Sequence, residues 1–231
     1  MKVEILGVKI DNITMEQAVN KVSSFFDGKT HTVFTPNPEI IMLAQKDEEL
    51  MNALNSADIL LPDGIGVVIG SKLIGKPLPE RVAGYDFACN LLNTDRTFYL
   101  LGAKPGVAEM AAEKLKMQGA KIVGTHDGYF KDDTEIINDI NNKKPDILLV
   151  CLGAPKQEKW IYENKDKLNV ALCLGVGGTL DVIAGTAKRA PMIYQKLYIE
   201  WLYRAVKEPY RIPRLMALPQ FIIKVAFGGR K

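Results

Sequence analysis

Six short apolar runs, each followed by a segment with helical periodicity, constrain the fold of this chain more than any other feature. The runs are HTVFT, ADILLP, RTFYLLG, AKIVG, DILLVCLG and VALCLGVGG, which begin at residues 31, 57, 96, 120, 146 and 170. Strands that alternate with helices are typical of a parallel sheet with helices on both faces. We therefore predict an α/β fold with a Rossmann-like, mostly parallel sheet.

The segment ahead of this alternation is expected to be structural. VEILGVKI, residues 3–10, predicts a strand or small hairpin. Thr14 and Gln17 have the spacing of a capping box for a helix that reaches Phe26. The three cysteines are odd in number, far apart and set in apolar runs, so we predict reduced packing residues and no disulfide framework: Cys89, Cys151 and Cys173.

Charge divides the chain near Gly185. Residues 186–231 hold ten Lys or Arg side chains against two Glu, whereas the rest holds twenty basic against twenty-five acidic side chains. We predict a Rossmann-like catalytic domain of residues 1–185 and a basic, amphipathic, helical C-terminal appendage of residues 186–231.

The appendage combines cations with bulky apolar side chains. Three arginines recur at helical spacings, provided that the intervening prolines do not break the helix, and are candidates to bind a diphosphate: Arg204, Arg211 and Arg214. The apolar residues between the cations suit a segment on an anionic membrane surface, and a docked terminal helix with a solvated basic face is the alternative. Because the aromatics are embedded in aliphatic runs, no nucleic-acid partner is expected.

The N-terminal segment and the apolar runs bear on localisation. No stretch of eighteen apolar residues occurs, and Glu4 follows closely on the N-terminus. Neither a spanning helix nor a signal peptide fits this pattern. We predict a cytoplasmic protein that is peripheral on the inner face of the plasma membrane.

Polar residues and glycines stand just past the carboxyl ends of the predicted strands. In an open parallel sheet, the loops at that edge form the ligand crevice. We therefore predict that residues far apart in sequence converge on one site there: Thr35, Asn37, Asp63, Gly102, Asp127, Tyr129, Gln157 and Asp181.

Two nucleotide-binding signatures are absent. GVGGTLD, residues 175–181, places Leu180 where a dinucleotide fingerprint needs its third glycine, which argues against a nicotinamide dehydrogenase. GSKLIGKP, residues 70–77, imitates a phosphate loop, but Pro77 replaces the magnesium-binding Ser or Thr and the preceding segment has a helical pattern.

No metal cofactor is predicted. The chain has two histidines, no Cys/His cluster with ligand spacing and no Asp-x-Asp pair. A nucleotide diphosphate would therefore be neutralised by helix N-termini and basic side chains. LGAKPG, residues 101–106, suits that purpose, and an ordinary strand-to-helix turn is the alternative.

Several of these residues have a plain structural interpretation as well. Asp63 in LPDGIG is either a functional carboxylate or a helix N-cap, a position that Asp often fills. Asn37 lies between two prolines, as a turn residue would. The Gln157 amide is placed to reach a ligand or to complete a cap.

Nine motifs in order resemble the WecG/TagA/CpsF glycosyltransferases, and the resemblance covers essentially the whole chain. The motifs are TPNPE at 35–39, LPDGIG at 61–66, ERVAGYD at 80–86, LLGAKPG at 100–106, HDGYF at 126–130, LGAPKQE at 152–158, GVGGTLDVIAG at 175–185, KRAP at 188–191 and EWLYR at 200–204. The resemblance implies a metal-independent, inverting transfer of N-acetylmannosamine from its UDP form, without a cofactor. The implied acceptor is N-acetylglucosamine on undecaprenyl diphosphate, a polyprenyl-diphosphate-linked sugar, and the product is the linkage unit of wall teichoic acid.

The resemblance also implies residue roles, with Asp63 as the general base. By the same likeness Thr35, Asn37 and Gln157 hold the donor sugar, and Arg81 lies near the acceptor diphosphate. Tyr129 and Asp181 match the uridine contacts. The residues implied around the diphosphates are the Gly102 loop, Arg204, Arg211 and Arg214.

Three alternatives stay open at this point. A relative of the same family would use another donor, such as UDP-N-acetylmannosaminuronic acid or UDP-glucose. A different class is a membrane-surface module that binds nucleotide without chemistry, and a nicotinamide enzyme is third. The amphipathic appendage also favours self-association, so a homo-oligomer is a further expectation.

Overall fold

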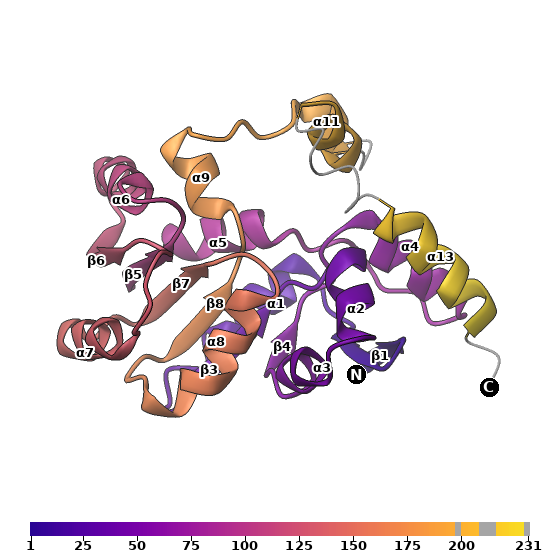
Figure 1. The fold of residues 1–231 in the computed structure, drawn as a ribbon, viewed down its shortest axis with the longest axis horizontal. Helices are drawn as coiled ribbons and strands as arrows, with labels where there is room; N and C mark the ends of the chain where they lie inside the picture. Colours follow the sequence, from indigo (N-terminus) through magenta and orange to yellow (C-terminus); the bar gives the residue numbers. More distant parts are fainter. Residues whose placement is uncertain (197–199, 208–215, 229–231) are drawn as a thin grey trace.

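A six-stranded parallel sheet forms the centre of the protein (Figure 1). The structure is a computed structural model that describes residues 1–196, 200–207 and 216–228. The strand order is β4-β3-β8-β7-β5-β6, and every neighbouring pair is parallel. All six predicted strands are confirmed: β3 His31–Phe34, β4 Ile59–Leu60, β5 Thr97–Gly102, β6 Lys121–His126, β7 Ile147–Cys151 and β8 Leu172–Gly175.

Helices cover both faces of this sheet, as predicted (Figure 1). One face carries α2 (Pro38–Ala44), α3 (Glu48–Asn55), α7 (Thr134–Lys143) and α8 (Lys156–Asn164), which continues into a 3-10 turn at Lys165–Lys167. The other carries α1 (Met15–Val22), α5 (Gly84–Leu92), α6 (Val107–Met117) and α9 (Thr179–Ala184). The division follows from handedness, because right-handed crossovers in opposite directions along a sheet place their helices on opposite faces.

Each face of the sheet has its own hydrophobic core. Along β5, Tyr99 and Leu101 join the cluster with α2, α3, α7 and α8, whereas Phe98 and Leu100 join the cluster with α1, α5, α6 and α9. A strand that is buried on both sides has no polar face, so its sequence is a continuous apolar run rather than an alternation. This is why the strands were recognisable in the sequence.

The N-terminal predictions hold except at one boundary. β1 (Lys2–Ile5) and β2 (Val8–Asp11) form an antiparallel hairpin. The capping box is present, since the Thr14 hydroxyl accepts the Gln17 N–H and the Gln17 side chain accepts the Thr14 N–H. Helix α1 ends at Val22, four residues short of the predicted end at Phe26.

Two helices were missing from the predicted alternation. Helix α3 begins behind Asp47, whose carboxylate accepts the Leu50 N–H at 3.0 Å. Helix α5 begins at Gly84, inside a motif that gave no helical signal. The segment that leads into the phosphate-loop imitation, residues 70–77, is α4 (Ile65–Leu73), so it is helical as its pattern indicated. The three cysteines are free thiols, as expected.

The described part of the C-terminal region consists of α10 (Met192–Lys196), α11 (Glu200–Lys207) and α13 (Ala217–Gly228). Helix α13 docks on α2 and α4 (Figure 1) and buries Phe221 and Val225. Gly70 permits this approach, because a Cβ there would lie 2.8 Å from the Phe221 ring. The apolar residues predicted for a membrane surface are thus divided, with Phe221 in the core and Phe227 80% exposed. The division at Gly185 stays a prediction.

The described helices include none that is long and apolar enough to cross a bilayer.

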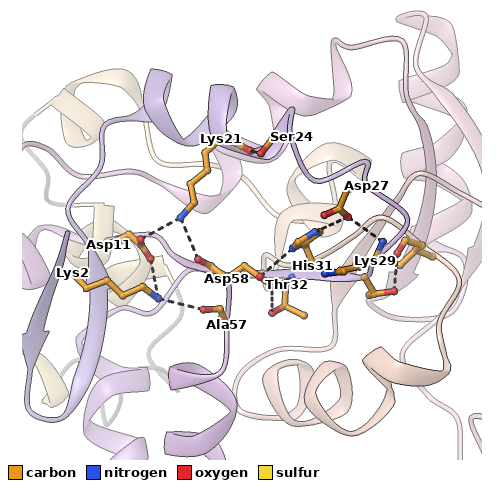
Figure 2. Close-up of polar contacts among 12 residues, drawn as sticks. Lys2, Asp11, Lys21, Ser24, Asp27, Lys29, His31, Thr32, Ala57 and Asp58 are labelled. Atoms are coloured by element: carbon orange, nitrogen blue, oxygen red, sulfur yellow. Dashed lines mark hydrogen bonds and ion pairs between the residues drawn. The ribbon is translucent and has the colours of Figure 1, made fainter.

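Charged side chains join the hairpin, α1 and the sheet at the amino-terminal edge of β3 and β4 (Figure 2). The buried Asp11 carboxylate accepts the Leu60 N–H at 2.9 Å and lies within 3.6 Å of the Lys2 and Lys21 ammonium groups. The Asp58 carboxylate accepts the Thr32 N–H at 2.8 Å.

His31 lies between two carboxylates in this group. Its Nδ1 is 3.1 Å from Asp58 and its Nε2 is 3.1 Å from Asp27 (Figure 2). The ring also stacks on Phe25. Burial opposes the charged form, but the two hydrogen bonds and the negative charges outweigh it and raise the pKa of His31. Only the imidazolium donates to both carboxylates at once.

This raised pKa predicts how stability depends on pH. The stabilisation is fully present below the unfolded pKa of about 6.5 and is lost as pH rises through the higher folded value. We expect the free energy of unfolding in urea to fall between pH 6 and pH 8.5, and His31→Gln to flatten that fall. His126→Gln keeps both carboxylate pairs and should retain the wild-type dependence. If the free energy of unfolding depended on pH in the same way in wild type and His31→Gln, the raised pKa of His31 would be contradicted.

Candidate functional site

The predicted site residues line the carboxyl edge of the sheet. Because neighbouring parallel strands are about 4.8 Å apart, six strands spread the loops over roughly 24 Å. The site is therefore an elongated row with two ends rather than one compact cluster. The candidate residues follow the strands in sheet order: Asp63 after β4, Thr35 and Asn37 after β3, Asp181 in the helix after β8, Gln157 in the helix after β7, Gly102 at the end of β5, and Asp127 and Tyr129 after β6.

Asp63 occupies the β4 end of this row. Its N–H donates to Leu61 O at 2.9 Å and to Pro36 O at 3.3 Å, so the β4 loop lies against the β3 loop. The N-cap of α4 is Gly64, with φ +87°, and the N-cap interpretation of Asp63 is therefore wrong. The carboxylate is 26% exposed and its Oδ1 lies 3.5 Å from Arg81 Nε.

Thr35 and Asn37 lie beside Asp63 but use their side chains within the scaffold. The buried Thr35 hydroxyl donates to Gly175 O at 3.1 Å. It packs against Gly84, where a Cβ would approach the Thr35 methyl to 2.9 Å. Asn37 is the N-cap of α2, because its Oδ1 accepts the Ile40 N–H at 3.0 Å, rather than a simple turn residue.

Gln157 lies in the middle of the row and is buried. Its Oε1 accepts the Gly177 N–H at 3.0 Å, and its Nε2 donates to Glu158 at 2.9 Å. The amide thus joins α8 to the loop after β8. Burial raises the pKa of the Glu158 carboxyl, and the hydrogen bond from Gln157 offsets this shift only in part.

The β5 and β6 loops form the opposite end of the row. Gly102 has φ +130°, and a Cβ there would lie 2.4 Å from the Cys151 carbonyl. The next residue, Ala103, donates its N–H to Cys151 O at 3.1 Å and accepts the Gly128 N–H at 2.9 Å. Gly106 then caps α6 with its backbone in the left-handed region. The β5 loop, the β6 loop and the end of β7 are therefore held together by backbone contacts.

The two residues predicted to contact uridine are Tyr129, after β6, and Asp181, after β8. Tyr129 is 71% exposed, and its N–H donates to the Asp127 carboxylate at 2.7 Å. Asp181 lies in the first turn of α9, which packs on α6, and its Oδ1 accepts the Thr186 hydroxyl at 3.3 Å.

The predicted arginines of the appendage have no described side chains. Arg204 falls within α11, and only its backbone is described. Arg211 and Arg214 lie outside the described residues.

A series of linked ion pairs at the Asp63 end of the row was not predicted from the sequence. Arg81 Nη2 lies 2.6 Å from Glu200 of α11, and Glu200 lies 3.6 Å from Arg189 Nε. Arg189 pairs bidentately with Asp86 at 2.7 and 2.8 Å. Burial opposes the charge of Arg81, but the two adjacent carboxylates raise its pKa, and it stays a cation. The signal available in the sequence was the presence of these residues in the motifs ERVAGYD, KRAP and EWLYR.

The fold is that of an open α/β protein, a class that binds its ligands in the crevice at the carboxyl ends of the strands, where the glycine loops and paired charges of this protein lie. Residues 3–231 match the model of the glycosyl transferase WecG/TagA/CpsF family, and the chain belongs to this family. It is therefore a glycosyltransferase.

Named relatives are similar over the whole of this chain and most of their own length. Three proteins of Staphylococcus aureus strains MW2, NCTC 8325 / PS 47 and MRSA252 are each 38% identical over 100% of this chain and 94% of their own length. Each is named N-acetylglucosaminyldiphosphoundecaprenol N-acetyl-beta-D-mannosaminyltransferase.

The contact of Gly102 with Cys151 predicts a site-specific loss of stability. Gly102→Ala should lower the free energy of unfolding by roughly 2 to 4 kcal/mol, because the new methyl meets backbone atoms that cannot move aside. Gly119→Ala is the matched control, since it has φ +94° but no atom within 4 Å. It should lose only about 1 kcal/mol, the strain of a left-handed backbone. Equal losses in urea unfolding would contradict the steric explanation.

Proposed function

We propose that this protein transfers N-acetylmannosamine from UDP-N-acetylmannosamine to N-acetylglucosamine carried on undecaprenyl diphosphate. The product would be the linkage unit of wall teichoic acid. The observation that carries the proposal is the similarity, over the whole chain, to transferases named for this reaction. In the transfer, the acceptor hydroxyl oxygen bonds to the anomeric carbon with inversion, and the bond from that carbon to the UDP oxygen breaks.

Asp63 is the proposed general base, which takes the proton of the acceptor hydroxyl as UDP leaves. Its carboxylate is partly exposed at the carboxyl edge and is not an N-cap. Arg81 lies 3.5 Å from Asp63, and we propose that it also lies near the diphosphate of the acceptor. The proposed base thus lies at the β4 end of the row, and the leaving group, UDP, points toward the β5 and β6 end.

UDP is proposed to bind at the β5 and β6 end. The Gly102 loop and the α6 N-terminus, capped by a glycine without a side chain, offer backbone N–H groups to a diphosphate. Tyr129 offers an exposed aromatic face for uracil, and Asp181 a carboxylate for hydrogen bonds from uridine.

The donor sugar is proposed to lie between these ends, beside Thr35, Asn37 and Gln157. Since these side chains already hold neighbouring loops, their effect on the sugar would come mainly through the shape of the crevice. No metal is assigned a role in this proposal, and the leaving group is neutralised by cations of the C-terminal region, namely Arg204, Arg211 and Arg214.

The protein is further proposed to work as a peripheral protein on the inner face of the plasma membrane. Phe227 and Ile223 of α13 are 80% and 59% exposed, and Lys224 lies between them in sequence. Apolar side chains next to a cation favour binding to an anionic lipid surface. At that surface the protein would bind its lipid-linked acceptor.

Acceptor-dependent release of UDP tests the reaction. We expect release from UDP-N-acetylmannosamine with a synthetic prenyl-diphosphate-N-acetylglucosamine, and we expect it to continue in EDTA. Asp63→Asn should lower kcat on the order of a hundredfold or more, because a positioned base supplies two to four orders of magnitude. Asp95→Asn removes an exposed carboxylate near the amino end of β5 and should match wild type.

Each other result has a defined meaning. Full turnover by Asp63→Asn would remove this residue from the role of base. Loss of turnover in EDTA, restored by a divalent cation, would overturn metal independence. Release only from UDP-N-acetylmannosaminuronic acid or UDP-glucose would identify another donor, and UDP binding without release would favour a binding module.

A further inference from the structure

Glu200 is a buried carboxylate in the C-terminal region, where most of the charged side chains are basic. It is the first residue of α11 and is 8% exposed. A buried carboxylate is destabilising unless it is paired, and here two arginines share it. Arg81 Nη2 lies 2.6 Å from Oε2, and Arg189 Nε lies 3.6 Å from Oε1.

Arg81 contacts Glu200 and Asp63 through different nitrogens of one rigid group. Its Nη2 is held by Glu200, and its Nε lies 3.5 Å from Asp63 Oδ1. The guanidinium is planar, so fixing Nη2 fixes the direction in which Nε points. Nε is buried and has no hydrogen-bond partner among the described residues, so its contact with Asp63 is an ion pair without a hydrogen bond.

Arg189 anchors the other side of Glu200 to the body of the protein. Its guanidinium is bidentate to Asp86 of α5 and lies 4.5 Å from the centre of the Tyr85 ring. Helix α5 is fixed in one of the two cores through Phe87. The position of Glu200 is therefore set by α5, through Asp86 and Arg189, and not by α11 alone.

We propose that Glu200 is a positioning residue for sugar transfer, which holds the Arg81 guanidinium against Asp63. The proposal rests on the proposed role of Asp63 as general base. It makes the first turn of α11 part of the catalytic site, because the orientation of the base then depends on a residue of the C-terminal region.

The proposal predicts an effect on turnover rather than on donor binding. Glu200→Gln keeps the shape and one acceptor oxygen but removes the charge, and Glu200→Ala removes both. We expect kcat to fall on the order of tenfold in Glu200→Gln and further in Glu200→Ala, with KM for the UDP-sugar unchanged. Glu200→Asp, which keeps the charge, should recover part of the loss.

A double-mutant cycle separates positioning from a general structural role. If Glu200 acts through Arg81, then Glu200→Gln should have no further effect on kcat in an Arg81→Ala background. Asp58→Asn is the control for stability, since it removes hydrogen bonds at the opposite edge of the sheet. It should lower the melting temperature and leave kcat unchanged.

Wild-type kcat in both Glu200→Gln and Glu200→Ala, or an undiminished effect in the Arg81→Ala background, would overturn the proposal. The NMR signal of the Arg81 Nε–H gives a readout that does not require turnover. It should shift in Glu200→Gln and stay in place in Asp58→Asn, and an unchanged signal would also overturn the proposal. If wild type forms no product, the proposed function fails, and the Arg81 signal still tests the contact.

Discussion

The parallel sheet, buried on both faces, is the constraint on which the rest of the structure depends. Buried strands must satisfy every backbone N–H and C=O within the sheet, which fixes their register. Because all six strands point the same way, their carboxyl ends meet at one edge. The helices on the two faces bury alternate side chains, such as Leu100 and Leu101, and leave that edge to the loops.

The two ends of this edge have different chemistry. At the β4 end, Asp63 and Arg81 place opposite charges 3.5 Å apart in a partly covered position. At the β5 end, Gly102 brings backbone against backbone and places the start of α6 beside the crevice. Between them, Gln157 joins α8 to the loop after β8. A reaction that needs a base at one point and an anionic leaving group at another fits such a row.

Among the described residues, two helices of the C-terminal region are attached to the first half of the chain by different kinds of interaction. Helix α13 is held by burial of Phe221 and Val225 against α2 and α4. Helix α11 is held by the charge of Glu200, shared between Arg81 and Arg189. The burial of Phe221 and Val225 does not involve Asp63, whereas Arg81, which pairs with Glu200, also lies 3.5 Å from the Asp63 carboxylate. Helix α11 is thus connected through Arg81 to the residue that we propose as the base.

The sequence by itself determined the six strands, the hairpin, the capping box and the edge of the sheet at which the candidate residues lie, because each depends on periodicity or on residues a few positions apart. It also indicated the family, through nine ordered motifs. Only the tertiary structure decided that Gly64 rather than Asp63 caps α4, and that Phe221 belongs to the core. It alone paired Arg189 with Asp86, 103 residues away, because which charges meet depends on how the helices pack and not on local pattern.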